Sequence, residues 1–180
     1  MNPPKDIVVN GVSLPRKYIH EAGHAVTSAT LSTDPVSLCD QPDSTDEGKQ
    51  TAAMCIVDVF PGEHEPIKLF FECRIAAIYA GVLAEAFFEV GDETFETYAL
   101  RLWENIDETD SVRVEKISIC DMPKHDIHAE DALAIRKKAW NRARQTIPDN
   151  KESIVRVAIA LHESGCLTDA EIRALLTPSG

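Results

Sequence analysis

The stretch RKYIHEAGHAVTSA, residues 16–29, contains an HExxH motif formed by His20, Glu21 and His24. Pro15 precedes it, and proline is favoured in the first turn of a helix, so we expect this stretch to be helical. At 3.6 residues per turn the two histidines lie on one face, where both imidazoles can bind one cation at ~2.0–2.1 Å. The glutamate points about 100° away, where it can act as a general base on a water that zinc has made acidic. The motif therefore predicts a Zn²⁺ site with a catalytic carboxylate.

A catalytic zinc site needs a third protein ligand and leaves one position for water. The motif by itself leaves that ligand open among several carboxylates and four further histidines. For His125 and His128, in the segment HDIH, we favour positions in a solvated loop. For His162, beside Leu161, we favour a surface or packing role. A chance HExxH arises on the order of one time in a hundred in a chain this long, so we favour the zinc interpretation. The four histidines are His64, His125, His128 and His162.

Composition indicates one soluble domain, 1–180. The chain has 180 residues, of which 44% are hydrophobic and 27% charged. These values are typical of a globular protein with a sizeable core. The net charge of −12 argues against nucleic acid and against anionic membranes as partners.

We expect a cytoplasmic protein without membrane insertion. The longest apolar run, IAAIYAGVLA at 75–84, has about half the ~20 residues that a spanning helix needs. The first residues, MNPPKDIVVNG, lack the basic start and apolar core of a secretion signal. The five cysteines are odd in number and form no CxxC pair, which is typical of reduced thiols.

The pattern after the first helix predicts a small sheet and a long helix. Two β-type runs, PVSLC (35–39) and AAMCIVDVF (52–60), flank a polar segment and should form a hairpin or adjacent strands. Pro66 opens a helix that should end near Gly91. Its small residues recur every four positions and should let the first helix approach closely; they are Ala76, Ala80 and Ala84, with Ala77 and Gly81 beside them.

Further helices are expected along the rest of the chain. The last one has a capping box, Thr168 with Glu171, and a hydrophobic staple of Leu167 with Ile172. The fold class is therefore α+β and mostly α-helical: the HExxH helix and the long small-residue helix with a small β-sheet, followed by a C-terminal helical bundle. The other expected helices are 92–106, 110–120, 129–147 (which Pro148 should break) and 150–164 (which Gly165 should end).

Several of these segments resemble the proteolytic domain of the FtsH-type zinc metallopeptidases. YIHEAGHAV (18–26) is similar to the family's HExxH helix, and IAAIYAGVLAEAFF (75–88) to its helix with a Gly-Gly-Arg-x-Ala-Glu centre. ETDSVRVEKI (108–117) is similar to the segment that supplies the family's aspartate ligand. The two C-terminal helices, 132–176, have the family's lengths. The resemblance covers roughly residues 16–176.

By position, the resemblance implies roles for individual residues. It makes His20 and His24 metal ligands, Glu21 the catalytic acid/base and Asp110 the third ligand. The main rival for the third ligand is Asp107.

The chain also departs from the family pattern. Ala80, Gly81 and Val82 stand where the family has two glycines and an arginine, and residues 91–106 lengthen the approach to the aspartate. No G-x-x-x-x-G-K-[ST] motif occurs. We therefore expect a protease domain without the family's AAA ATPase and membrane anchor.

Two functions follow as hypotheses. The first is a zinc metalloendopeptidase that hydrolyses unfolded or flexible polypeptides, with an extended substrate added to the edge of the small sheet. The alternative is a metal-binding, non-proteolytic interaction or assembly module derived from the same family. The expected partners are a polypeptide substrate and either further copies of the chain or a separate ATPase.

Overall fold

The structure is a computed structural model that describes residues 6–32, 35–42, 50–56, 66–104 and 109–177. Most of these residues are helical, and the strands form two small antiparallel sheets, so the predicted fold class, α+β and mostly α, is confirmed. The helices and strands follow in the order β1 (Asp6–Val9), β2 (Val12–Pro15), α1 (Arg16–Leu31), β3 (Val36–Pro42), β4 (Gln50–Ile56), α2 (Ile67–Val90), α3 (Phe95–Glu104), α4 (Thr109–Lys116), α5 (Ala129–Asp149), α6 (Lys151–Ser164), β5 (Cys166–Leu167) and α7 (Asp169–Leu176).

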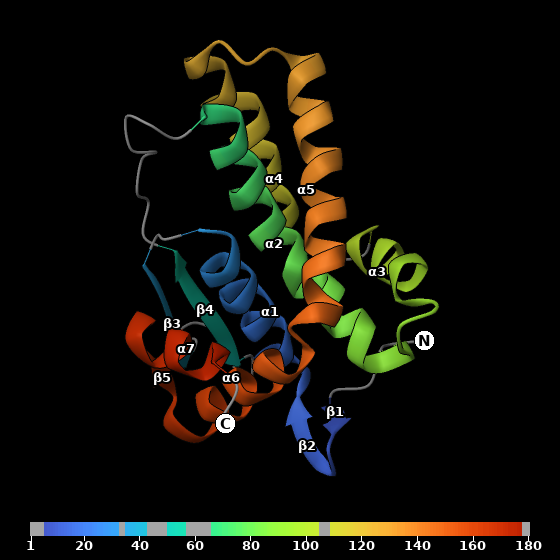
Figure 1. Cartoon of the computed structure of the whole chain (residues 1–180), viewed down its shortest axis with the longest axis vertical. Coiled ribbons are helices and arrows are strands. Elements are labelled where there is room, and N and C mark those ends of the chain that lie inside the picture. Colours follow the sequence, from blue (N-terminus) through green and yellow to red (C-terminus); the bar gives the residue numbers. More distant parts are fainter. Residues whose placement is uncertain (1–5, 33–34, 43–49, 57–65, 105–108, 178–180) are drawn as a thin grey trace.

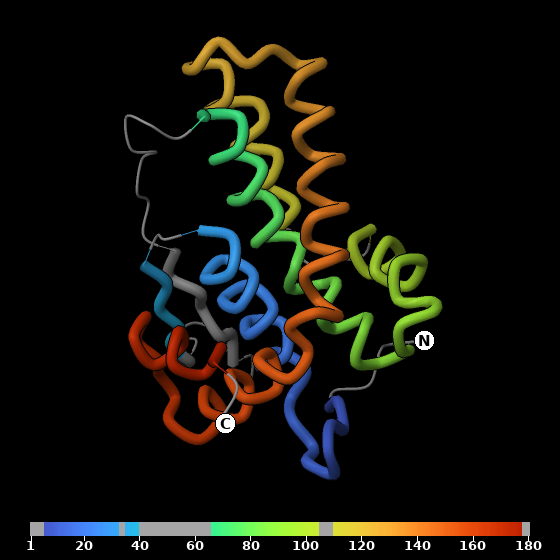
Figure 2. Tube along the Cα trace, in the orientation of Figure 1, coloured from blue at the N-terminus to red at the C-terminus, as the bar shows by residue number. Residues whose placement is uncertain are grey.

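Helix α1 lies at the centre of the packing. It contacts α2 on one side and the C-terminal helices α6 and α7 on another, and α2 in turn packs against α5 (Figure 1). The trace in Figure 2 shows α1 in blue between α2 in green and the C-terminal α6 and α7, while α5 in orange lies on the other side of α2. Among the described helices, none combines the length and apolar character that crossing a membrane requires.

The small-residue contact between α1 and α2 is as predicted. A Cβ atom added to Gly23 of α1 would lie 2.6 Å from the carbonyl oxygen of Ala80 and 2.7 Å from the Cβ of Ala84, both on α2. Real Cβ atoms essentially never come that close to another heavy atom, so α1 needs glycine at this position. The two backbones therefore approach more closely than larger side chains would permit.

The three-stranded sheet has β3 between β4 and β5. Antiparallel pairing of Val36 with Ile56 through Pro42 with Gln50 confirms the predicted hairpin over this part of the chain. Residues 57–60 of the predicted second strand lie outside the described residues. The sheet lies beside α1, as Figure 1 shows.

An N-terminal hairpin, β1–β2, was not predicted. Asn10 and Gly11 form its turn with φ of 51° and 81°, the conformation that the Asn-Gly pair favours in two-residue hairpins. Strand β2 ends at Pro15 and α1 begins at the next residue. The hairpin therefore fixes the point at which the HExxH helix starts.

The ends of the later helices follow the sequence signals closely. The capping box of Thr168 and Glu171 is present, and Gly165 ends α6 in the left-handed conformation. Helix α5 runs one residue past Pro148, so the predicted break falls slightly later than expected. Helix α4 is shorter than predicted, because the chain continues from Ile117 as a π-helical turn and then as a 3₁₀ turn to His125.

Candidate metal centre

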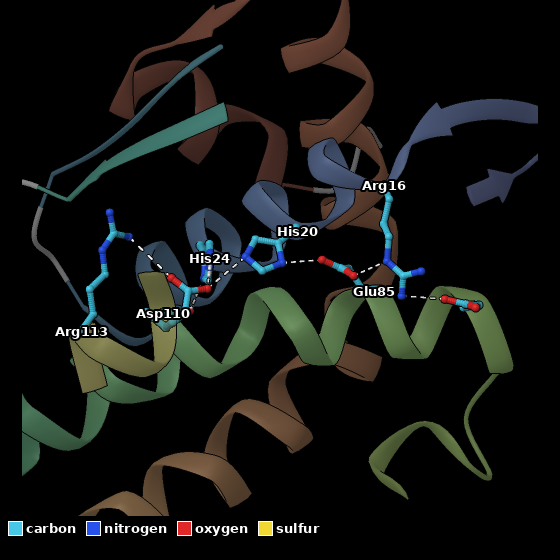
Figure 3. Close-up of polar contacts among 8 residues, drawn as sticks. Arg16, His20, His24, Glu85, Asp110 and Arg113 are labelled. Atoms are coloured by element: carbon cyan, nitrogen blue, oxygen red, sulfur yellow. Dashed lines mark hydrogen bonds and ion pairs between the residues drawn. The ribbon is translucent and has the colours of Figure 1, made fainter. Parts of the chain in front are cut away.

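Three side chains of α1 that are four residues apart face α2. Arg16 pairs with Glu85 and Glu89 of α2, His20 contacts Glu85, and His24 contacts the carbonyl of Ala77. Positions along α1 thus meet decreasing positions along α2, which means that the two helices run antiparallel. Figure 3 shows this row of contacts along the interface.

Asp110, the second residue of α4, completes a cluster with the two histidines. Its Oδ2 atom lies 3.1 Å from Nε2 of His20 and 3.3 Å from Nε2 of His24 (Figure 3). Ligand atoms on a tetrahedral zinc at ~2.0–2.1 Å are about 3.3–3.4 Å apart, so both separations fit the edges of such a site. Two imidazole nitrogens and one carboxylate are also a donor set that zinc commonly takes.

The remaining ring nitrogen of each histidine is held by an acceptor. Nδ1 of His20 lies 2.5 Å from Oε1 of Glu85, and Nδ1 of His24 lies 2.7 Å from the carbonyl oxygen of Ala77. Metal-ligating histidines typically donate this N–H to a carboxylate or a backbone carbonyl, which fixes the tautomer and the ring orientation. Both rings are therefore oriented with Nε2 toward Asp110.

Gly81 makes room for both imidazoles. A Cβ atom at this position would lie 2.5 Å from Cε1 of His24 and 2.6 Å from Nε2 of His20. The rings cannot move aside without leaving Glu85 and the Ala77 carbonyl, to which they are bonded. The structure therefore requires glycine at position 81.

Glu21 lies beside the cluster but is not part of it. It is partly buried, and its Oε2 atom is shielded from water and makes no hydrogen bond within the described part of the chain. Burial raises the pKa of this carboxyl group, although His24 and His20 act in the opposite direction. A buried carboxylate with an unpaired oxygen and a raised pKa has the properties of a general base.

The charges of the cluster are strongly coupled. Burial by itself would lower the pKa of His20, but hydrogen bonds to Asp110 and Glu85 outweigh burial and hold it well above the usual value of 6.5. Burial by itself would raise the pKa of Asp110, but His20 and His24 hold it far below the usual value. Without a metal, the cluster is therefore held together by the partly buried imidazolium of His20 and the carboxylate of Asp110.

Arg113 lies at the edge of this cluster. It is one turn after Asp110, and its Nη1 atom lies 3.6 Å from Oδ1 of that aspartate, with 45% of its side chain exposed. It is too far for a hydrogen bond and too exposed for a strong ion pair.

The other candidate histidines lie away from the cluster. His125 and His128 are exposed, and the ring of His125 contacts Phe71. The exposed ring of His162 packs 4.8 Å from that of Tyr18, in agreement with a surface or packing role. His64 and the rival ligand Asp107 lie outside the described residues. Within those residues, His20, His24 and Asp110 are the group of three potential ligands that the structure brings together.

Sequence reasoning did not identify the residues that hold His20 in place. Arg16, Glu85 and Glu89 come from two helices about 70 residues apart, and no local motif links them. Their spacing is the available signal: Arg16 is four residues before His20, and Glu85 is four residues after Gly81.

No family model matches the chain, and no curated protein matches it in a sequence search. The resemblance to FtsH-type metallopeptidases therefore stays a prediction that is based on the segments quoted above.

Proposed function

We propose that the chain is a zinc-dependent metalloendopeptidase of the FtsH-like kind that hydrolyses peptide bonds in unfolded or flexible polypeptides. The observation that carries this proposal is the orientation of the two histidines. Each has Nδ1 bonded to an acceptor and Nε2 within 3.3 Å of the same Asp110 oxygen. A helix that carried HExxH by chance would have no reason to hold both rings in this way.

His20, His24 and Asp110 would hold the zinc ion. The ion would supply a Lewis acid and would lower the pKa of a bound water toward ~7. Glu85 and the carbonyl of Ala77 keep the two imidazoles in the required tautomer.

Glu21 is the proposed catalytic residue. Its unpaired Oε2 accepts a proton from water as the water oxygen bonds to the peptide carbonyl carbon. It then gives this proton to the departing amine as the carbon–nitrogen bond breaks. The same carboxyl group thus acts first as a base and then as an acid, which a pKa raised by burial favours.

The proposed substrates are extended polypeptides. A peptide bond must reach the cluster with several residues unpaired, and a folded domain rarely offers such a segment because its backbone groups are already paired. Assayed by itself, the chain should cleave an unstructured protein and spare a stable folded one, with no effect of ATP. Further copies of the chain or a separate ATPase are proposed as partners. The odd number of cysteines without a CxxC pair supports a cytoplasmic location.

The test compares wild type with Glu21→Gln and, as a matched control, with Glu152→Gln, which changes a carboxylate that is 80% exposed on α6. Wild type and the control should contain one zinc per chain and hydrolyse an unstructured protein. Glu21→Gln should keep its zinc and lose roughly 10²–10⁴-fold in rate. Zinc without hydrolysis in wild type would instead identify a metal-binding interaction module, and a wild type without zinc would contradict both functions.

A further inference from the structure

A row of contacting charged and polar side chains leads away from the proposed metal centre to α3. Oε1 of Glu85 contacts His20, and Oε2 of the same carboxylate pairs with Nε of Arg16. Nη2 of Arg16 lies 2.6 Å from Glu89, and the hydroxyl of Tyr98 donates to Glu89 at 2.5 Å. The inner part of this row is visible in Figure 3.

Most side chains of this row are shielded from water. The side chains of Arg16, Glu85 and Glu89 are 12%, 14% and 16% exposed, respectively. The Nε–H of Arg16 donates a hydrogen bond to Glu85, while the approach of Nη2 to Glu89 is an ion-pair contact. Arg16 therefore fixes the position of Glu85, which in turn orients the ring of His20.

Arg16 occupies a position that local preference does not favour. It is the first residue of α1, and a cation at a helix N-terminus is opposed by the helix dipole. Two carboxylates from α2 compensate for this. A residue that violates a local rule and contacts two carboxylates is expected at a functional or strained site.

We propose that Arg16 is a positioning residue for the metal centre, and that α3 contributes to metal affinity through the contact of Tyr98 with Glu89. This inference rests on the proposed zinc site. It adds a role for residues 95–104, which supply no ligand and which lie in the segment that departs from the family pattern. Any event that withdraws Tyr98 would loosen Glu89, then Arg16, then Glu85, and would weaken the binding of zinc.

The molecule contains a matched control for the loss of an arginine–glutamate pair. Arg142 of α5 binds Glu72 of α2, with Nη2 and Nε at 2.6 and 2.7 Å from Oε1. This pair also joins α2 to a neighbouring helix, but it has no contact with the histidines. A change in general stability should therefore appear in variants of either arginine, whereas a change in zinc affinity should appear only in those of Arg16.

The experiment measures the Kd of Zn²⁺ for the full chain by competition with a chelating dye, and the visible spectrum of the Co²⁺-loaded protein. Arg16→Gln should weaken zinc binding about 10–100-fold and alter the cobalt spectrum. Arg142→Gln should change neither by more than about twofold. Arg16→Lys should fall between wild type and Arg16→Gln, because it keeps the charge and loses the planar fork. Tyr98→Phe should weaken binding roughly two- to fivefold through the lost hydrogen bond.

The outcomes separate this inference from the proposed function. A wild type that binds zinc while Arg16→Gln binds it equally well would overturn the inference and leave the metal site intact. If circular dichroism shows that Arg16→Gln is unfolded, the zinc affinities of Arg16→Lys and Tyr98→Phe serve as the test. Affinities equal to that of wild type would overturn the inference. A wild type without zinc affinity would overturn both.

Discussion

The two faces of α2 show opposite ways of packing one helix against another. On the face toward α1, small residues and Gly81 bring the backbones close, and the space above the glycine contains the two imidazoles. On the face toward α5, the centroid of the Tyr79 ring lies 5.1 Å from that of Trp140 of α5 and 4.8 Å from that of Trp103 of α3. One face thus leaves space for polar rings, while the other is filled by aromatic rings.

This difference follows the spacing of residues along α2. The face toward α1 carries Ala77, Gly81, Glu85 and Glu89, each four residues from the next. The opposite face carries Glu72 and Tyr79, seven residues apart. Substitutions on the first face should therefore act on metal binding, and those on the second face on stability.

The largest effect is expected from Gly81→Ala. The added methyl group would lie within 2.6 Å of both imidazoles and would push them away from Glu85 and the Ala77 carbonyl. We expect zinc affinity to fall about 100-fold, since overpacking and the loss of ligand orientation act together. Dye competition for Zn²⁺ measures this. A variant with unchanged affinity would show that the histidines bind no metal in this geometry.

The matched change on the opposite face is Trp140→Ala. Removal of a half-buried aromatic ring that packs on Tyr79 should lower the free energy of unfolding by about 2 kcal/mol. Zinc affinity should stay within about twofold of wild type, because Trp140 is remote from the ligands. Urea unfolding of the metal-free protein and zinc titration give the two quantities. A large loss of zinc affinity would mean that the two faces are coupled.

A pH dependence of zinc affinity is expected from the face of α2 that carries the cluster. The pKa of His20 is held well above 6.5, so this imidazole is protonated near neutral pH and zinc must displace the proton. Zinc affinity should therefore rise about tenfold per pH unit until the pH passes this pKa. Calorimetric titration in buffers of different ionisation enthalpy should show the release of about one proton at pH 7, and no release would contradict the protonated state.

The stability of the metal-free protein should vary with pH in the opposite direction. A raised histidine pKa contributes stability that is present below 6.5 and lost as the pH rises through the folded-state value. A lowered aspartate pKa contributes stability that is present above 3.8 and lost in acid. The contribution of the cluster is therefore greatest from about pH 4 to 6.5 and declines in more alkaline solution. Urea titrations of wild type and Asp110→Asn across this range test this sign.

The smallest effect is expected from Arg113→Ala. Its guanidinium is 45% exposed and 3.6 Å from Asp110, so water screens most of the interaction. Zinc affinity should change less than about threefold, against the much larger loss expected for the mostly buried Arg16. A loss of zinc affinity as large as that of Arg16→Gln would contradict the expectation that the more exposed arginine contributes less to zinc binding.

The sequence predicted the elements whose signals are local. The four-residue spacing of His20 and His24 indicated a shared helical face, and Thr168 with Glu171 marked the start of the last helix. Asp110 was reached by resemblance, and the structure places its carboxylate between the two imidazoles. The Asn-Gly pair at Asn10 and Gly11 is a local signal as well, and it marks the turn of the N-terminal hairpin.

The rest of the site depends on the register between helices, which no local pattern fixes. Glu85 is the residue that ends an apolar run, and nothing nearby shows that it meets His20 across the interface. The role of Gly81 becomes evident only when α1 lies against α2 at the distance that Gly23 permits. Contacts between residues so far apart in sequence follow from packing, which the sequence specifies only through the whole fold.

Gly81, beneath the imidazoles, would also make the loss of this site difficult to reverse in evolution. Glycine within a helix is about 1 kcal/mol less favourable than alanine, so α2 retains an unfavourable residue for as long as the histidines need the space. In a descendant that had lost both histidines, alanine at position 81 would no longer clash with the imidazoles and would favour the helix. Once fixed, that alanine would obstruct any return of the imidazoles. Loss of the proposed metal centre would then be difficult to reverse, because a single methyl group would block the imidazoles.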